Sequence, residues 1–149
     1  MLLKMTHEIS TEVLIHATPE AVWRVLTSFA SYPGWNIYIK SLSGPVTVGS
    51  TVTVRFETAK AKPVTVRVRV LVVDPGKELR WSGQLLLPGL VDGVHRFELL
   101  DHRNGTTTLR QSESFRGLLV PLIRKILDQN NTKAFRAMNQ QIKELAEVH

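Results

Sequence analysis

Three polar side chains lie where the surrounding pattern predicts an apolar surface. Apolar and polar residues alternate on both sides of a turn, and a strand places every second side chain on the same face. This count puts His95 on the face of Phe97, and it puts Gln111 and Glu113 on the face of Phe115. An imidazole, an amide and a carboxyl group on an apolar face are the kinds of group that move protons or orient a bound molecule.

A hairpin is predicted to bring two of these side chains together. Asn104 and Gly105 form a strong signal for a tight turn between two runs of alternating residues. Counting outward from that turn, His95 lies directly or diagonally across from Glu113, unless a β-bulge shifts the register. A buried carboxylate and imidazole are costly unless they are paired, so the pair is expected whether or not it does chemistry.

The pair allows three interpretations, which the sequence leaves open. It can be a satisfied core pair, a polar anchor that orients a ligand, or a general acid and base. In the third interpretation Glu113 orients His95 and stabilises its charge, and His95 moves a proton on a bound carbonyl or enol, as in a cyclisation or dehydration. Such a catalyst would be a lyase or an isomerase.

Other chemistry has little support in the sequence. The five histidines are dispersed without ligand-like spacing, and there is no cysteine, so we expect no metal site, disulfide or thiolate. No glycine-rich phosphate loop occurs either. We therefore expect no cofactor.

The elements that would position these residues begin with one strand and two helical pieces. Residues 8–16 alternate well enough for a strand. Residues 18–20 then supply a cap, a proline suited to the first helical position and a glutamate suited to the helix dipole, which predicts a helix over residues 19–28. The break at residues 32–36 predicts a short helical turn or loop, and residues 39–48 a further short strand.

A meander of antiparallel strands is predicted for residues 51–115, where apolar residues take alternate positions between turn residues. In the clearest run, valines at every second position from Val64 to Val72 are expected to share one face.

Helical spacing returns after Pro121 and predicts a helix over residues 119–147, about 40 Å long. A sheet with one apolar face and a helix with one apolar stripe bury each other. The sequence therefore predicts a single α+β domain over residues 1–149, in which a curved antiparallel sheet of about seven strands wraps around a long C-terminal helix. The apolar stripe of that helix is expected to comprise Leu122, Ile123, Ile126, Leu127, Ala134, Phe135, Met138, Ile142 and Leu145.

Further residues are expected to contact a ligand held between sheet and helix. Some are aromatic or polar residues of the break after the first helix, where core packing is an equal alternative. Others are inward-facing residues of the strands and of the long helix. One of them is an asparagine in the apolar stripe of that helix, where a polar residue is unusual. These candidates, besides His95, Gln111 and Glu113, are Tyr32, Trp35, Asn36, Trp81, Phe97, Asn130, Ala134 and Met138.

Several motifs resemble the START/Bet v 1-like (SRPBCC) superfamily, specifically its bacterial polyketide cyclase/dehydrase-like group. They are IHATPEAVW at residues 15–23, FASYPGWN at 29–36, PGL at 88–90, GVHRF at 93–97 and ESFRG at 113–117. The resemblance spans nearly the whole chain and implies the helix-grip fold with a ligand cavity. Members include lipid and hormone binders and aromatase/cyclases, so the resemblance says little about the occupant of the cavity.

Composition sets the remaining expectations. The apolar run Leu85-Leu86-Leu87 ends at Pro88, far short of the ~20 residues that a membrane-spanning helix needs, and no signal peptide is expected. We therefore expect a cytoplasmic protein without membrane insertion, of undetermined oligomeric state. The net charge is +6, but the basic residues are scattered, so nucleic acid is a less favoured partner. If it binds, the outer face with Arg55, Arg67, Arg69 and Arg80 would hold it.

The leading functional hypothesis is binding of a hydrophobic small molecule, such as a lipid, a polyketide or an aromatic metabolite, in an internal cavity. One alternative is a cyclase or dehydratase that uses His95 and Glu113 as acid and base. A further alternative is a START-like protein that associates with RNA or ribosomes.

Overall fold

The expected order of strands and helices is confirmed in the computed structural model, which describes residues 5–58, 61–85 and 87–148. Up to residue 35 the chain forms one strand and the short helices, and after residue 35 it forms a run of strands followed by the long helix. The elements are β1 (Thr6–Ile15), α1 (Pro19–Leu26), the 3-10 turn η1 (Phe29–Ser31), α2 (Tyr32–Trp35), β2 (Ile39–Ser43), β3 (Thr51–Thr58), β4 (Ala61–Asp74), β5 (Glu78–Leu85), β6 (Val91–Asp101), β7 (Thr107–Arg116) and α3 (Val120–Ala146).

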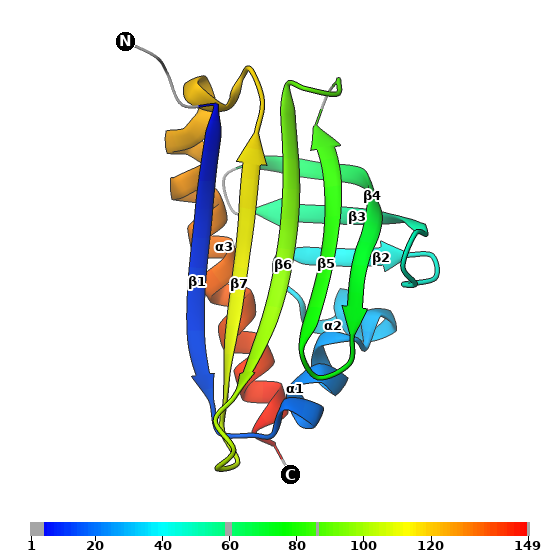
Figure 1. Ribbon diagram of the computed structural model, residues 1–149, viewed down its shortest axis with the longest axis vertical. Coiled ribbons are helices and arrows are strands. Elements are labelled where there is room, and N and C mark those ends of the chain that lie inside the picture. The colour runs from blue at the N-terminus through cyan, green and yellow to red at the C-terminus, as the bar shows by residue number, and fades with distance from the viewer. Residues whose placement is uncertain (1–4, 59–60, 86, 149) are drawn as a thin grey trace.

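The seven strands form one curved antiparallel sheet in the order β1-β7-β6-β5-β4-β3-β2. In Figure 1, β1, β7, β6 and β5 run along the long axis of the molecule, whereas β2 and β3 run across it. The helix α3 runs alongside β1 and β7, and α1 and α2 lie near its C-terminal end (Figure 1). The predicted fold class, a helix-grip arrangement of sheet and terminal helix, is therefore confirmed.

The curvature of the sheet coincides with a bulge in β4. Val70 is opposite Trp81 and Val72 is opposite Arg80, so Leu71 is an extra residue on β4. The predicted common face of alternating valines is therefore wrong at Val72, because the bulge reverses the alternation. Val73, opposite the buried Leu79, packs against the core after the bulge.

The start of α1 agrees with the predicted cap, since the Thr18 side chain accepts a hydrogen bond from the Ala21 N–H at 3.3 Å. The helix ends at Leu26, two residues before the predicted end. Thr27 and Ser28 donate their hydroxyl groups to the carbonyl oxygens of Trp23 and Arg24, respectively. Side-chain hydroxyls thus satisfy carbonyls of the last turn and allow the chain to leave the helix.

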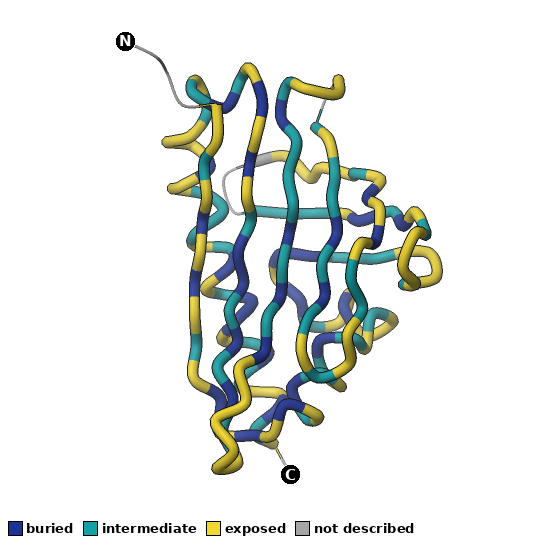
Figure 2. The backbone as a smooth tube through the Cα atoms, in the orientation of Figure 1, coloured by how far each residue is buried: buried dark blue, intermediate teal, exposed yellow. Residues whose placement is uncertain are grey.

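The helix α3 buries one stripe against the concave face of the sheet. Among the described residues, no helix is long and apolar enough to span a bilayer. The predicted stripe is wrong at Leu122, which is 76% exposed, whereas Ile126 is 56% exposed but borders the space between α3 and the sheet. At that end, Val120 and Leu127 already occupy the buried side, and Figure 2 shows the first turns of α3 largely exposed. Leu145, at the other end, is also exposed.

A close backbone contact fixes where α3 begins. The N–H groups of Leu118 and Leu119 donate to the carbonyl oxygens of Gly89 and Leu90. Gly117 has φ +146°, and a Cβ there would lie 2.2 Å from the Leu90 oxygen. The start of α3 is therefore attached to the β5–β6 loop at a point where no side chain fits.

Candidate functional site

A cavity of about 220 Å³ lies between the concave face of the sheet and the first half of α3. Its walls are mostly aliphatic and aromatic, with few charged groups. Of the described charged side chains, Lys62 and Glu113 line it. The lining residues are Tyr38, Phe56, Thr58, Lys62, Val64, Val66, Val68, Trp81, Gly83, Gln84, Leu85, Val91, Gly93, Glu113, Phe115, Ile126, Leu127, Asn130 and Asn131.

The predicted register of the hairpin is confirmed, because His95 on β6 is directly opposite Glu113 on β7. Their exposure differs. His95 is buried, with 1% of its side chain exposed, whereas 16% of the Glu113 side chain is exposed. Glu113 belongs to the cavity wall and His95 lies behind it, outside the lining.

Aromatic rings enclose His95. Its ring stacks on Trp81, with centroids 5.3 Å apart and planes at 28°. Phe97 and Phe135 approach it to 4.8 Å and 5.1 Å between centroids, and Tyr38 stacks at 6.3 Å. The imidazole therefore contacts ring faces rather than water.

A chain of hydrogen bonds leads away from His95 toward α3 and β1. Nε2 of His95 lies 2.9 Å from Oε1 of Gln111, and Nε2 of Gln111 donates to Oδ1 of Asn139 at 2.8 Å. Nδ2 of Asn139 donates to Oγ1 of Thr11 at 2.8 Å, and that hydroxyl donates to the Gln111 carbonyl oxygen at 3.0 Å. All four side chains are buried, so the chain satisfies polar groups that would otherwise be costly.

The other ring nitrogen of His95 faces Glu113. Nδ1 lies 3.4 Å from Oε1 of Glu113 and makes no hydrogen bond within the described residues. The carboxylate occupies space that Gly93 leaves free, since a Cβ at Gly93 would be 2.5 Å from Oε2 of Glu113. Gly93 thus makes room for the carboxylate.

Tyr38 completes the polar surroundings of this pair. It is buried and lines the cavity. Burial raises the pKa of its phenol well above the usual value of 10, and the negative charge of Glu113 raises this pKa further. Tyr38 therefore stays neutral beside the carboxylate.

Only part of the expected contact set reaches this cavity. Trp81, Glu113 and Asn130 line it. Asn130 also borders a second hollow, in which Ala134 takes part. Phe97 and Met138 are fully buried core residues, and Gln111 belongs to the hydrogen-bond chain.

The residues of the break after α1 do not line this cavity and have structural contacts, in line with the core-packing alternative. Tyr32 is buried and donates its hydroxyl to the Leu26 carbonyl oxygen. Trp35 donates its indole N–H to the hydroxyl of Ser31 at 2.9 Å. Asn36 Oδ1 accepts hydrogen bonds from the backbone N–H groups of Tyr38 and Ile39, at 2.9 and 2.8 Å. These side chains hold the turn between α2 and β2.

Among the site residues that sequence reasoning missed, four add polar or aromatic groups near His95. Thr11 and Asn139 belong to the hydrogen-bond chain, and Tyr38 and Phe56 line the cavity. Counting by two from Ile9 would have placed Thr11 inward, and helical spacing from Phe135 would have placed Asn139 in the apolar stripe. The signal was present for both, as polar residues at core positions.

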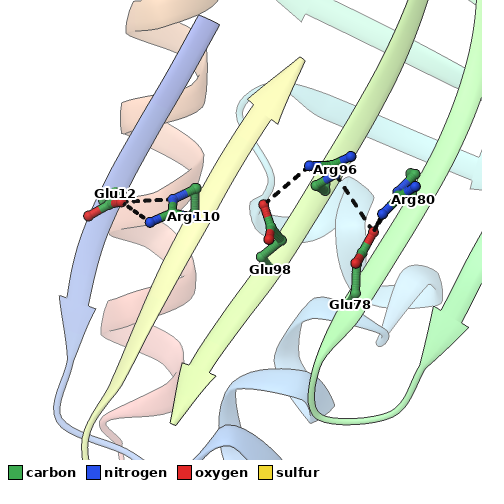
Figure 3. A network of polar contacts seen from close by, with 6 residues as sticks. All are labelled: Glu12, Glu78, Arg80, Arg96, Glu98 and Arg110. Atoms are coloured by element: carbon green, nitrogen blue, oxygen red, sulfur yellow. Dashed lines mark hydrogen bonds and ion pairs between the residues drawn. The ribbon is translucent and has the colours of Figure 1, made fainter. Parts of the chain in front are cut away.

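The outer face of the sheet carries a network of ion pairs (Figure 3). Arg80 bonds Glu78 at 2.5 Å, and Arg96 lies 3.7 Å from the same carboxylate and 3.8 Å from Glu98. Arg110 pairs with Glu12 at 2.7 Å, on the neighbouring strands β7 and β1. Of the four arginines proposed for a basic face, Arg80 is thus paired, and the other three, Arg55, Arg67 and Arg69, are exposed.

Metal ligands do not gather in the described ranges, where no three His, Asp or Glu side chains come together.

Comparison with known proteins gives a family and a fold. A family model described as polyketide cyclase / dehydrase and lipid transport matches residues 6–147. No curated protein sequence matches the chain.

Solved structures resemble the chain over nearly its whole length. A norcoclaurine synthase point mutant from Thalictrum flavum, solved with a transition-state analogue, has a TM-score of 0.75 at 16% identity, covering 98% of this chain and 97% of that one. The Zhui aromatase/cyclase from a Streptomyces species has a TM-score of 0.77 at 16% identity, covering 95% and 94%. A protein from Mesorhizobium loti has a TM-score of 0.69 at 21% identity, covering 93% and 96%. At these identities the likeness concerns the fold.

Proposed function

The chain belongs to the polyketide cyclase/dehydrase and lipid-transport family within the START/Bet v 1-like superfamily, and from that premise we propose that it binds a hydrophobic small molecule in the cavity between sheet and α3. The guest is a lipid fragment, a polyketide or an aromatic metabolite. The proposal depends on one observation: a cavity of about 220 Å³ with largely apolar walls opens onto one carboxylate, Glu113. Apolar walls with few placed polar groups are typical of small-molecule sites.

A fluorescent apolar probe, N-phenyl-1-naphthylamine, tests the proposal in solution. Val66 lines the cavity, and its neighbour Thr65 is exposed and does not line it. Val66→Phe fills the cavity, so we expect the affinity for the probe to fall about tenfold or more, because the displaced apolar contacts are worth at least ~1.4 kcal/mol. The matched variant Thr65→Phe should leave the affinity unchanged. Equal affinities in both variants would contradict binding in this cavity.

A second candidate function is acid/base catalysis of the cyclase or dehydratase kind. Its support is the position of Glu113, which lines the cavity while His95 contacts it from behind. This position exchanges the roles expected from the sequence. Glu113 contacts the guest, and His95 orients the Glu113 carboxylate and balances the charge of that carboxylate. The carboxylate would remove a proton from the carbon beside a bound carbonyl group, which leaves an enolate, and the resulting carboxylic acid would return a proton to that carbon.

Hydrogen–deuterium exchange into 2-tetralone, followed by NMR in D₂O, tests this second function. The wild-type protein should speed the exchange above the buffer rate, and Glu113→Gln should abolish the increase. An unchanged rate with wild-type protein would remove catalysis of this kind and leave binding as the function.

Binding of nucleic acid has less support than binding of a small molecule in the cavity. Arg80, one of the four arginines of the expected basic face, bonds Glu78. Binding through Arg55, Arg67 and Arg69 would weaken steeply with salt. RNA retention that persists after replacing these three residues would exclude this surface. Location in the cytoplasm stays an expectation from the sequence.

A further inference from the structure

The hydrogen-bond chain behind His95 has a fixed direction. A backbone carbonyl oxygen can accept a hydrogen bond but cannot donate one. The Gln111 carbonyl oxygen therefore takes the hydroxyl proton of Thr11, at 3.0 Å. The Phe135 carbonyl oxygen, at 3.4 Å, faces the side-chain amide of Gln111 and requires its NH₂ group. These two carbonyls settle the orientation of both amides in the chain.

His95 must then donate from Nε2. With its NH₂ group turned to Phe135 and Asn139, Gln111 presents Oε1 to His95 at 2.9 Å. Reversing the Gln111 amide would bring its oxygen against the Phe135 carbonyl oxygen, and no proton would lie between them. The proton on Nε2 is thus set by residues that do not touch the cavity.

The remaining ring nitrogen decides the charge of the site. A neutral ring with its proton on Nε2 would leave an unprotonated Nδ1 only 3.4 Å from a carboxylate oxygen of Glu113. A proton on Nδ1 turns the repulsion between these two acceptors into attraction. The stacked face of Trp81, 5.3 Å between centroids, also favours a cation. His95 as an imidazolium and Glu113 as a carboxylate therefore form an attractive charge pair, in which Nδ1 and Oε1 are 3.4 Å apart without a hydrogen bond.

We propose that Thr11, Asn139 and Gln111 fix a proton on Nε2 of His95, that the charge of Glu113 holds a second proton on Nδ1, and that this Glu113 carboxylate accepts a hydrogen bond from a hydroxyl group of the guest. His95 already balances the charge of Glu113, and the walls around it are mostly apolar, so a neutral guest fits better than a cation. The ligand class is a phenol or other apolar alcohol. This choice of guest rests on the proposed function, whereas the assignment of the protons does not.

The protonation of His95 can be measured in the empty protein. Long-range ¹H–¹⁵N NMR at pH 7 on protein labelled with ¹⁵N-histidine distinguishes protonated from unprotonated ring nitrogens, and contacts with the Trp81 ring identify His95. We expect protons on both Nδ1 and Nε2. An unprotonated Nε2 would overturn the fixed chain, and an unprotonated Nδ1 would overturn the carboxylate that accepts the guest's hydroxyl.

The guest preference has its own measurement. Displacement of N-phenyl-1-naphthylamine by 2-naphthol and by 2-methoxynaphthalene compares a hydroxyl donor with a blocked one. We expect 2-naphthol to bind about tenfold more tightly to wild-type protein, as a hydrogen bond to a charged acceptor implies, and the preference to shrink several-fold in Glu113→Gln. Equal affinities in the wild type would overturn the hydroxyl preference. Absence of binding by both compounds would contradict the proposed function, while the nitrogen spectrum still decides the proton assignment.

Discussion

Nδ1 of His95 lies 3.4 Å from Oε1 of Glu113 across the β6–β7 hairpin, yet of these two residues only Glu113 lines the cavity. The carboxylate therefore meets any guest, and the imidazole supports it from the core. The predictions below concern the space that this carboxylate occupies, the chain that holds the imidazole and the surroundings of the pair.

Gly93→Ala should displace the Glu113 carboxylate, because the new Cβ would lie 2.5 Å from Oε2, and the preference for 2-naphthol over 2-methoxynaphthalene should therefore shrink. Oε2 is the end of a flexible side chain, so the loss of stability measured by urea unfolding should stay below about 1 kcal/mol. Gly34→Ala is the matched control. A Cβ at Gly34, in α2, meets nothing within 4 Å, so this change should be neutral or stabilising by up to about 1 kcal/mol. Equal effects of the two substitutions on the preference for 2-naphthol would contradict the close contact at Gly93.

Thr11→Val and Asn139→Leu should each destabilise the protein by about 1–3 kcal/mol, because each leaves a buried polar partner without its hydrogen bond. The double variant should lose less than the sum, since the second change no longer strands a partner. Urea unfolding of the four proteins gives the coupling energy. Strict additivity would mean that these two side chains do not interact.

The chain has two tyrosines, and burial raises the pKa of both Tyr32 and Tyr38 above the usual value of 10. The folded state thus binds these protons more tightly than the unfolded state does. The contribution to stability is complete below about pH 10 and is lost as the pH rises further. Absorbance at 295 nm should therefore show tyrosinate only when circular dichroism shows unfolding. Ionisation of either tyrosine in the folded protein would contradict its burial.

Whether the sequence predicts a contact depends on how far apart the two residues lie along the chain. One hairpin joins His95 to Glu113, so counting from its turn was sufficient to pair them. Thr11 meets Gln111 and Asn139 only because β1 lies beside β7 and under α3, which no local pattern specifies. The hairpin pattern therefore predicts the polar pair, whereas the hydrogen-bond chain behind it depends on contacts between distant segments.

The cavity walls illustrate a second limit. Alternation predicts which side chains point inward, but the bulge at Leu71 reverses it and bends the sheet, so Val72 leaves the predicted face. Tyr32 and Trp35 were candidates for ligand contact with core packing as an equal alternative, because an aromatic side chain suits either place. Their hydroxyl and indole groups instead bond Leu26 and Ser31.

Intermolecular NMR contacts between bound N-phenyl-1-naphthylamine and the protein's methyl groups test the central claim most directly. If the guest lies between sheet and α3, its aromatic protons should give nuclear Overhauser effects to the cavity residues Val66, Val91 and Leu127. Contacts confined to the exposed residues Leu118 and Leu122 would place the probe on the surface and contradict the account.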